Sequence, residues 1–259
     1  FKDKKYIDPK GKNVVVIGGG VLGLEAAWEL KKAQCKVNVL EAGNQLMGRQ
    51  LDDAASEMLK AISEANDIQI HTGVQIVSIE GEDHVTGVKL KDGEVIPAEL
   101  VIVSAGVRAN TAIAKDAGIE VDRAVVVNSK METSVEDIYA CGDCAQYQGV
   151  NYAIWPQALE QGKTAGANAA GDHTEYEQVP AALTFHGMNT ALFASGDNGK
   201  RPDVSYKTVE MKDSSKKQYE KLYFFNNRLC GVILIGDLSR MAELSVALEK
   251  KASFQEVVK

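Results

Sequence analysis

Cysteine is scarce in this sequence, and its scarcity limits the class of protein. Four of the 259 residues are cysteines, namely Cys35, Cys141, Cys144 and Cys230. They are too few and too scattered to form the disulfide framework of a small secreted protein, so we expect a protein of the reducing cytoplasm. The chain also lacks a signal peptide and any apolar run of about 18 residues, so no membrane partner is predicted.

Positive charge is in deficit as well, with 29 Lys and Arg against 36 Asp and Glu. The formal net charge of −7 disfavours a nucleic-acid-binding surface. The balance reverses near Pro180, because basic residues outnumber acidic ones from Gln178 onward. This change indicates a domain boundary. The basic C-terminal surface is either an ordinary solvated surface or a docking face for an acidic partner.

A cluster of glycines follows the first apolar run. In "KNVVVIGGGVLGLEAAWELKK", residues 14–17 predict a strand buried on both faces, and Gly18-x-Gly20-x-x-Gly23 leads into a helix. In a dinucleotide-binding turn, the first glycine permits the tight turn and the second lets the backbone approach a pyrophosphate. The third lets helix and strand pack closely, and the helix N-terminus faces the negative charge. The pattern predicts a Rossmann-like unit that binds a dinucleotide.

An acidic residue at the end of the next strand pattern, Glu41, specifies the nucleotide further. In dinucleotide-binding folds an acidic residue follows the glycine cluster by about 20 residues, and Glu41 lies at a similar spacing. A carboxylate there accepts hydrogen bonds from the adenosine ribose hydroxyls and repels a 2′-phosphate. No arginine follows before Arg49. We therefore expect NADH to be preferred over NADPH.

The rest of the chain alternates between helix and strand patterns. Residues 68–104 contain short alternating runs that predict a strand, an antiparallel meander and a final buried strand. "AVVVN" and "DIYAC" predict further buried strands, and "WPQALEQGKTAGANAA" predicts a helix with Pro156 in its first turn. Mostly strand patterns follow Pro180, and a helix comes after them. The predicted fold class is α/β with a small C-terminal α+β domain.

Cys141 and Cys144 stand two residues apart and allow three interpretations. A redox pair of the thioredoxin type would open a helix directly, which lowers the thiolate pKa, whereas here Asp143 lies between the two cysteines. A zinc site needs four ligands, and the sequence offers no second pair, so no metal is expected. Small structural residues beside a Gly-Asp pair are the preferred interpretation.

Four stretches together resemble one family. "VVVIGGGVLGLE", "LVIVSAGVRAN", "DIYACGDCAQ" and "WPQALEQGKTAGANAAG" are similar to motifs of the pyridine nucleotide–disulfide oxidoreductase superfamily, and the likeness covers roughly residues 11–172. The C-terminal portion is similar, more loosely, to the branch containing NADH oxidases, rubredoxin reductases and nitrite reductase flavoproteins. The resemblance implies an FAD-dependent NAD(P)H oxidoreductase, in which NADH passes hydride to the flavin.

The resemblance also implies roles for individual residues. Asp143 would hold the ribityl–phosphate part of FAD, and the helix that begins near Trp155 would point at the flavin ring. Glu25 would help to orient the nicotinamide, and no further catalytic residue is identified. The NAD-binding residues are then Gly18, Gly20, Val21, Leu22, Gly23, Glu25, Glu41 and Gly106. The FAD-binding residues are Gly142, Asp143, Trp155 and Gln157.

Three domains follow from these assignments. Residues 1–106 are predicted to form the NAD(P)-binding Rossmann-like domain with its meander, and residues 107–177 the C-terminal half of an FAD-binding domain. Residues 178–259 are predicted to form the C-terminal α+β domain of an interface or dimerisation type, which makes a homodimer one expectation. An acidic electron-transfer protein is another expected partner of its basic surface.

One part of the family pattern is missing. Members of the family carry an N-terminal glycine fingerprint for the ADP half of FAD, whereas this chain has one fingerprint, which is identified as the NAD one. Because the chain also opens on Phe1, we expect a fragment or a subunit whose missing FAD-binding segment lies elsewhere. The alternative is a non-catalytic NADH-binding module or assembly subunit without a flavin of its own.

Overall fold

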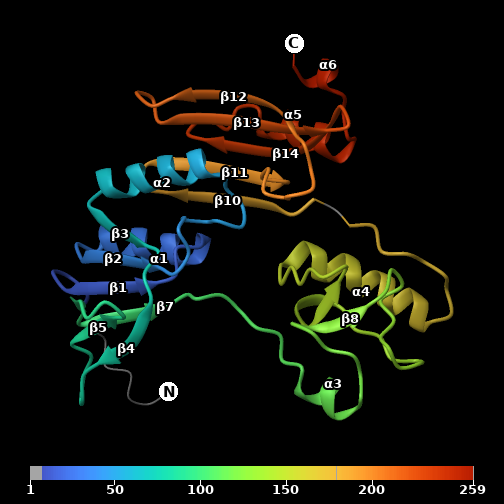
Figure 1. Cartoon of the computed structure of the whole chain (residues 1–259), viewed down its shortest axis with the longest axis horizontal. Coiled ribbons are helices and arrows are strands. Elements are labelled where there is room, and N and C mark those ends of the chain that lie inside the picture. The colour runs from blue at the N-terminus through green and yellow to red at the C-terminus, as the bar shows by residue number, and fades with distance from the viewer. Residues whose placement is uncertain (1–7, 179, 259) are drawn as a thin grey trace. The chain divides into compact units, whose positions relative to one another are not determined.

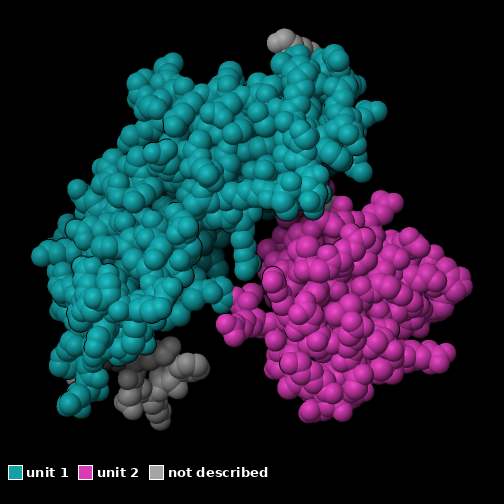
Figure 2. Space-filling view, in the orientation of Figure 1, with its two compact units in different colours: residues 1–106, 182–259 teal, residues 107–181 magenta. Residues whose placement is uncertain are grey.

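The computed structural model describes residues 8–178 and 180–258, which fall into two compact units (Figure 2). Unit 1 combines residues 1–106 with residues 182–259, and unit 2 consists of residues 107–181. The first and last of the three predicted domains thus share one unit, and the three-domain division itself stays a prediction. No helix in the described ranges is long and apolar enough to cross a membrane.

A parallel sheet forms the first half of unit 1, with the strand order β3-β2-β1-β7. Val14, Val15 and Val16 are fully buried because both faces of the sheet are covered, as the continuous apolar run predicted. Helix α1 ends in Lys31 and Lys32, where cations complement the helix dipole. The elements are β1 (Asn13–Ile17), α1 (Val21–Lys32), β2 (Lys36–Glu41), α2 (Asp53–Ala65), β3 (Ile68–Thr72) and β7 (Leu100–Val103).

The predicted antiparallel meander covers one face of this sheet. It consists of β4 (Ile76–Glu80), β5 (Gly87–Leu90) and β6 (Val95–Pro97). Val88, Leu90 and Ile96 of the meander pack with Val15 and Leu40 of the parallel sheet in one buried cluster. The meander therefore closes the face that α1 and α2 leave open.

An antiparallel sheet of five strands forms the second half of unit 1, in the order β10-β11-β14-β13-β12. In Figure 1, α2 lies between this sheet and the parallel sheet. Phe185, Leu192 and Ile233 of the antiparallel sheet share a core with α1, α2 and the parallel strands, and the opposite face packs against α5 and α6. The elements are β10 (Ala182–Gly187), β11 (Thr190–Gly196), β12 (Lys207–Asp213), β13 (Gln218–Phe225), β14 (Arg228–Ile235), α5 (Met241–Glu249) and α6 (Phe254–Val257).

Unit 2 is smaller and packs around one long helix. Its elements are α3 (Ala112–Asp116), β8 (Val125–Val127), the 3-10 turn η1 (Gly142–Cys144), β9 (Ala145–Tyr147) and α4 (Trp155–Ala169). Strands β8 and β9 pair in parallel, and buried Val125, Val127 and Met131 contribute to the core. Helix α4 carries proline in its first turn, as predicted.

The strand predicted at Asp137–Ala140 is wrong. Asp137 has a φ of +61°, which belongs to a turn, and Tyr139 forms a single antiparallel bridge with Glu132. Tyr139 and Ala140 pack against the unit 2 core, whereas Ile138 is exposed, and the run forms one bridge instead of a strand. The parallel partner of β8 is β9, which follows the Gly-Asp pair instead of preceding it.

Candidate functional site

The glycine turn between β1 and α1 has the geometry that a dinucleotide site needs. Gly18 has a φ of +115°, and a Cβ placed on it would lie 2.3 Å from the carbonyl oxygen of Ser104. A Cβ on Gly23 would lie 2.0 Å from the carbonyl oxygen of Gly18. A Cβ on Gly20 would meet no atom within 4 Å, and no side chain caps α1 at this residue. The N-terminus of α1 therefore borders open space at Gly20, where no side chain covers the backbone.

Glu41 lies beside this turn and is held there by two backbone groups. Its Oε2 atom accepts a hydrogen bond of 2.6 Å from the N–H of Gly19, and its Oε1 atom accepts one of 2.6 Å from the N–H of Gly43. Each carboxylate oxygen has two lone pairs, so both oxygens retain capacity for hydroxyl donors. The carboxylate is thus fixed in position and can accept further hydrogen bonds.

The other residues assigned to NAD lie at the same end of the sheet. Val21 and Glu25 are half-buried on α1, and the side chain of Leu22 is 69% exposed. Gly106 is exposed and has a φ of +86°. It follows β7, whose Val103 pairs with Ile17 at the end of β1. Gly106 therefore belongs to the carboxyl edge of the sheet, where open α/β sheets bind ligands.

Two residues that hold the turn were missed by the sequence analysis. Ser104, directly after β7, donates its N–H to the carbonyl of Ile17, and its own carbonyl crowds Gly18. Met47 donates its N–H to the carbonyl of Gly19 at 2.9 Å. Both act through backbone atoms and come from other parts of the chain, so no local residue pattern marks them.

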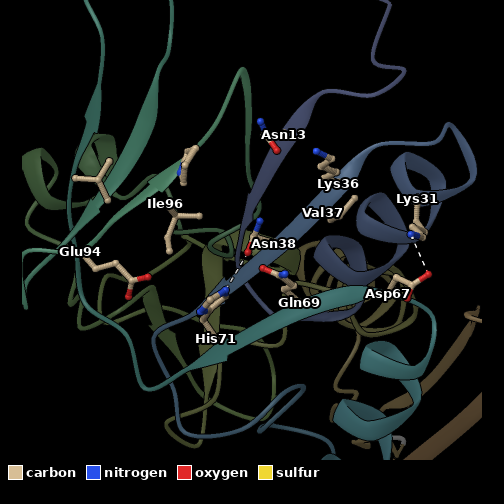
Figure 3. Close-up of a pocket in the computed structure, with 12 residues that line it drawn as sticks. Asn13, Lys31, Lys36, Val37, Asn38, Asp67, Gln69, His71, Glu94 and Ile96 are labelled. Carbon is tan, nitrogen blue, oxygen red and sulfur yellow. Dashed lines mark hydrogen bonds and ion pairs between the residues drawn. The ribbon is translucent and has the colours of Figure 1, made fainter.

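A pocket of about 490 Å³ lies along β2 and β3 beside β6, with the first residues of β1 and β2 in its lining (Figure 3). His71 Nε2 and Asn38 Oδ1 are 2.9 Å apart inside it, and Lys31 forms an ion pair with Asp67 at its rim. None of the residues assigned to NAD or FAD lines it. Its lining residues are Asn13, Lys31, Lys36, Val37, Asn38, Asp67, Gln69, His71, Glu94, Val95, Ile96 and Pro97.

In unit 2, the Gly-Asp pair lies against the first half of α4. Gly142 has a φ of +72°, and a Cβ on it would lie 3.3 Å from the Cβ of Ala158. The N–H of Gly142 donates a hydrogen bond of 2.8 Å to Oε1 of Gln161, which is a buried residue of α4. The carboxylate of Asp143 is exposed. The pair is therefore anchored through glycine, and the aspartate beside it is accessible to solvent.

The start of α4 presents one of its two assigned residues outward and one inward. Trp155 is 81% exposed, whereas Gln157 is 1% exposed. The hydroxyl of Tyr176 donates to Oε1 of Gln157 at 3.3 Å, so this side chain is directed into unit 2. No side chain caps the helix at Ile154. The N-terminus of α4 therefore has backbone N–H groups that no side chain caps, and the exposed Trp155 lies beside them.

The cysteines have the features of structural residues. All four are free thiols, and Sγ of Cys144 donates to the carbonyl of Cys141 at 3.3 Å. Burial raises the pKa of Cys141, and neighbouring Cys144 adds to the effect. Burial likewise raises the pKa of Cys230 to about 11. A raised pKa keeps the thiols of Cys141 and Cys230 protonated and weakly nucleophilic at neutral pH.

Comparison with known proteins identifies the family. The family model described as Pyridine nucleotide-disulphide oxidoreductase matches residues 2–162, and the one described as Rubredoxin NAD+ reductase C-terminal domain matches residues 180–252. The chain therefore belongs to the pyridine nucleotide-disulphide oxidoreductase family. Its predicted α/β fold class is confirmed by the same comparison, since related solved structures share the arrangement.

Three similar proteins illustrate the branch. The chain is 33% identical over 249 residues to "Nitrite reductase [NAD(P)H]" of Bacillus subtilis, covering 96% of this chain and 31% of that protein. It is 31% identical over 277 residues to "NADH oxidase" of Methanocaldococcus jannaschii, covering 98% and 61%. The crystal structure of NADH:rubredoxin oxidoreductase from Clostridium acetobutylicum aligns with a TM-score of 0.71 and 28% identity, covering 96% and 61%. The chain thus spans about a third to less than two thirds of these relatives.

Proposed function

We propose that this chain contributes the NADH-binding domain, the second half of the FAD-binding domain and the C-terminal domain of an NADH-dependent flavin oxidoreductase. The observation that carries the proposal is the glycine turn with Glu41 fixed beside it in unit 1. FAD, when bound, would accept hydride from NADH and release electrons to an acceptor that is not identified. The proposed location is the cytoplasm, because the chain has few and scattered cysteines.

The residues of unit 1 would bind and orient NADH. The pyrophosphate would approach the N-terminus of α1 through the space that Gly20 leaves open, where the helix dipole favours negative charge. The Glu41 carboxylate would accept hydrogen bonds from the adenosine ribose and repel a 2′-phosphate. Glu25 would help to position the nicotinamide. Positioning of the reacting atoms, rather than an acid or base of this chain, is the proposed contribution to the rate.

The residues of unit 2 would form part of a flavin site. Exposed Asp143 would hold the ribityl–phosphate region, and the N-terminus of α4 would stabilise negative charge on a bound flavin. Gln157 would contribute its backbone, because its side chain is buried. The chain carries one glycine fingerprint, so a further segment or subunit is proposed to bind the ADP half of FAD.

The electron acceptor is proposed to be a small electron-transfer protein or oxygen. Relatives include "Putidaredoxin reductase CamA" of Pseudomonas putida, 34% identical over 176 residues and covering 64% of this chain, and "NADH oxidase". The excess of Lys and Arg after Gln178 would suit an acidic protein partner. A homodimer through the C-terminal domain stays a proposal as well.

A visible absorption spectrum of the purified chain tests the proposed function. The spectrum is recorded first alone, then with added FAD, then with NADH. A two-band flavin spectrum that persists after gel filtration and bleaches with NADH is expected once the missing FAD-binding part is supplied. If the completed protein binds NADH and retains no flavin, the oxidoreductase proposal fails and the non-catalytic NADH-binding module replaces it.

Nucleotide preference gives a second expected result. Replacing Glu41 with alanine removes charged acceptors for the ribose, which are worth about 1.5–3 kcal/mol, so the Kd for NADH should rise about 10- to 100-fold. Adding Ala42→Arg should then favour NADPH, because a cation suits its 2′-phosphate. Fluorescence titration with both nucleotides measures the change. Glu82→Ala, at another exposed acidic residue, serves as the control and should leave both Kd values unchanged.

A further inference from the structure

A loop of the C-terminal sheet, residues 197–201, contacts the segment that flanks the glycine turn, residues 42–51. Asn198 Nδ2 donates to the carbonyl of Arg49 at 3.2 Å and to that of Leu51 at 3.4 Å. Lys200 Nζ donates to Oε1 of Gln45 at 2.5 Å and to the carbonyl of Gly48 at 3.0 Å. Four hydrogen bonds therefore join the C-terminal half of unit 1 to this segment.

The 197–201 loop is itself held firmly. Asp197 donates its N–H to the carbonyl of Cys230 at 2.8 Å, and its Oδ2 atom pairs with Nε of Arg201 at 2.7 Å. The hydroxyl of Tyr206 donates to the same carboxylate oxygen at 2.5 Å. A Cβ on Gly199 would lie 2.5 Å from the ring of Tyr223, so the loop packs closely on the sheet. Asn198 and Lys200 thus project from a fixed base.

The 42–51 segment, by contrast, has turns and bends but no helix or strand. It holds the glycine turn through Met47, whose N–H donates to the carbonyl of Gly19, while Glu41 just before it accepts from the N–H of Gly19. A Cβ on Gly19 would lie 2.6 Å from Cδ2 of buried Leu46. Both backbone polar groups of Gly19 are therefore bonded to Glu41 or the 42–51 segment.

We propose that Asn198 and Lys200 are positioning residues for NADH. They act through the 42–51 segment, which keeps Gly19 and the turn in the conformation that a dinucleotide would bind. Binding is tighter when the site is ordered in advance, because less ordering entropy is lost on association. The inference rests on the proposed NADH site in unit 1 and gives the C-terminal sheet a part in nucleotide affinity.

Two substitutions isolate this role. Asn198→Asp keeps the Oδ1 atom that accepts from the N–H of Lys200 at 3.3 Å. It removes both donors and sets a carboxylate against two carbonyls. Lys200→Met keeps the aliphatic stem and removes the ammonium group. Each is expected to raise the Kd for NADH at least about fivefold, the effect of losing roughly one hydrogen bond. Lys200→Arg, which keeps donors, should restore most of the affinity.

The experiment measures the NADH Kd of the full chain by fluorescence titration, alongside amide hydrogen exchange. Faster exchange at Gly19 and Met47 in the variants is expected, with exchange in β13 and β14 unchanged. Lys212→Met, at an exposed lysine of β12 on the same sheet, is the matched control and should bind like the wild type. Wild-type protein that binds no NADH would overturn the proposed function. Variants that match a binding-competent wild type in Kd and exchange would overturn the positioning role alone.

Discussion

Replacing Gly18 with alanine is expected to abolish measurable NADH binding. Gly18 has a φ of +115°, a backbone conformation that costs a residue with a Cβ about 1–3 kcal/mol. The added Cβ would also lie 2.3 Å from the carbonyl oxygen of Ser104. That oxygen belongs to the backbone at the end of β7, so no flexible side chain can give way. We expect the Kd for NADH to rise more than about 100-fold, together with a lower melting temperature.

Two further glycine variants separate binding from folding. Gly20→Ala meets no protein atom within 4 Å, so it should leave the melting temperature unchanged and still weaken NADH binding by filling the open space. Gly162→Ala lies in α4, also with nothing within 4 Å, and should leave NADH binding unaltered. Fluorescence titration and thermal unfolding of all three variants provide the measurement. Normal NADH affinity in Gly18→Ala would contradict the assignment of this turn as the nucleotide site.

Replacing Asp52 with alanine is expected to cause a large loss of stability. Asp52 caps α2 by accepting from the N–H of Ala55 at 2.8 Å. Its Oδ2 atom also accepts from the hydroxyls of Tyr219 and Tyr223, at 2.8 and 2.7 Å, and pairs with Lys221 at 2.9 Å. Burial, reinforced by hydrogen bonding to Asp52, raises the pKa of both tyrosines far above its usual value. One carboxylate thus joins α2 to the antiparallel sheet.

Removing this carboxylate leaves the two buried tyrosine hydroxyls without their acceptor, while the half-buried ammonium of Lys221 keeps Glu210, 2.8 Å away, as a partner. Each buried hydroxyl left without an acceptor costs about 1–3 kcal/mol and the lost helix cap about 1 kcal/mol, so a total loss of about 3–5 kcal/mol is expected. Chemical denaturation should report a decrease of that size in the free energy of unfolding. Glu57→Ala, at an exposed acidic residue of the same helix, should change it by less than about 0.5 kcal/mol. Equal stability of the two variants would refute the linking role of Asp52.

The same residue should make stability depend on pH in the acid range. Burial opposes ionisation of Asp52, but hydrogen bonds from Ala55, Lys221, Tyr223 and Tyr219 together hold its pKa below the usual value. A pKa that is lower in the folded state stabilises the fold above the unfolded-state pKa of about 3.9 and ceases to do so as pH falls through the folded value. Wild-type stability should therefore fall more steeply below about pH 4 than that of Asp52→Asn.

The sequence by itself determined those features that depend only on residues close together in the chain. A strand, three spaced glycines, a helix and Glu41 lie within one stretch of chain, and the backbone conformations they require follow from residue type. The antiparallel meander and helix α4 were likewise readable, because alternation and helical periodicity are short-range signals. The family resemblance rested on these same stretches.

Local patterns failed where a turn or a distant partner decided the outcome. The strand predicted at Asp137–Ala140 is a single bridge, because Asp137 adopts a left-handed turn conformation that an apolar run does not reveal. The sequence also did not show that the side chain of Gln157, which stays a predicted FAD-binding residue, is buried and bonded to Tyr176.

Only the tertiary structure showed how the glycine turn is held. Asn198 and Lys200 reach the 42–51 segment from about 150 residues further along the chain, and Asp52 meets Tyr219 and Tyr223 across a similar separation. Sequence periodicity reports which face of an element is buried, and it carries no information on which distant element covers that face. The folded core decides those pairings, and through them it sets the geometry of the glycine turn that the sequence predicts as the nucleotide site.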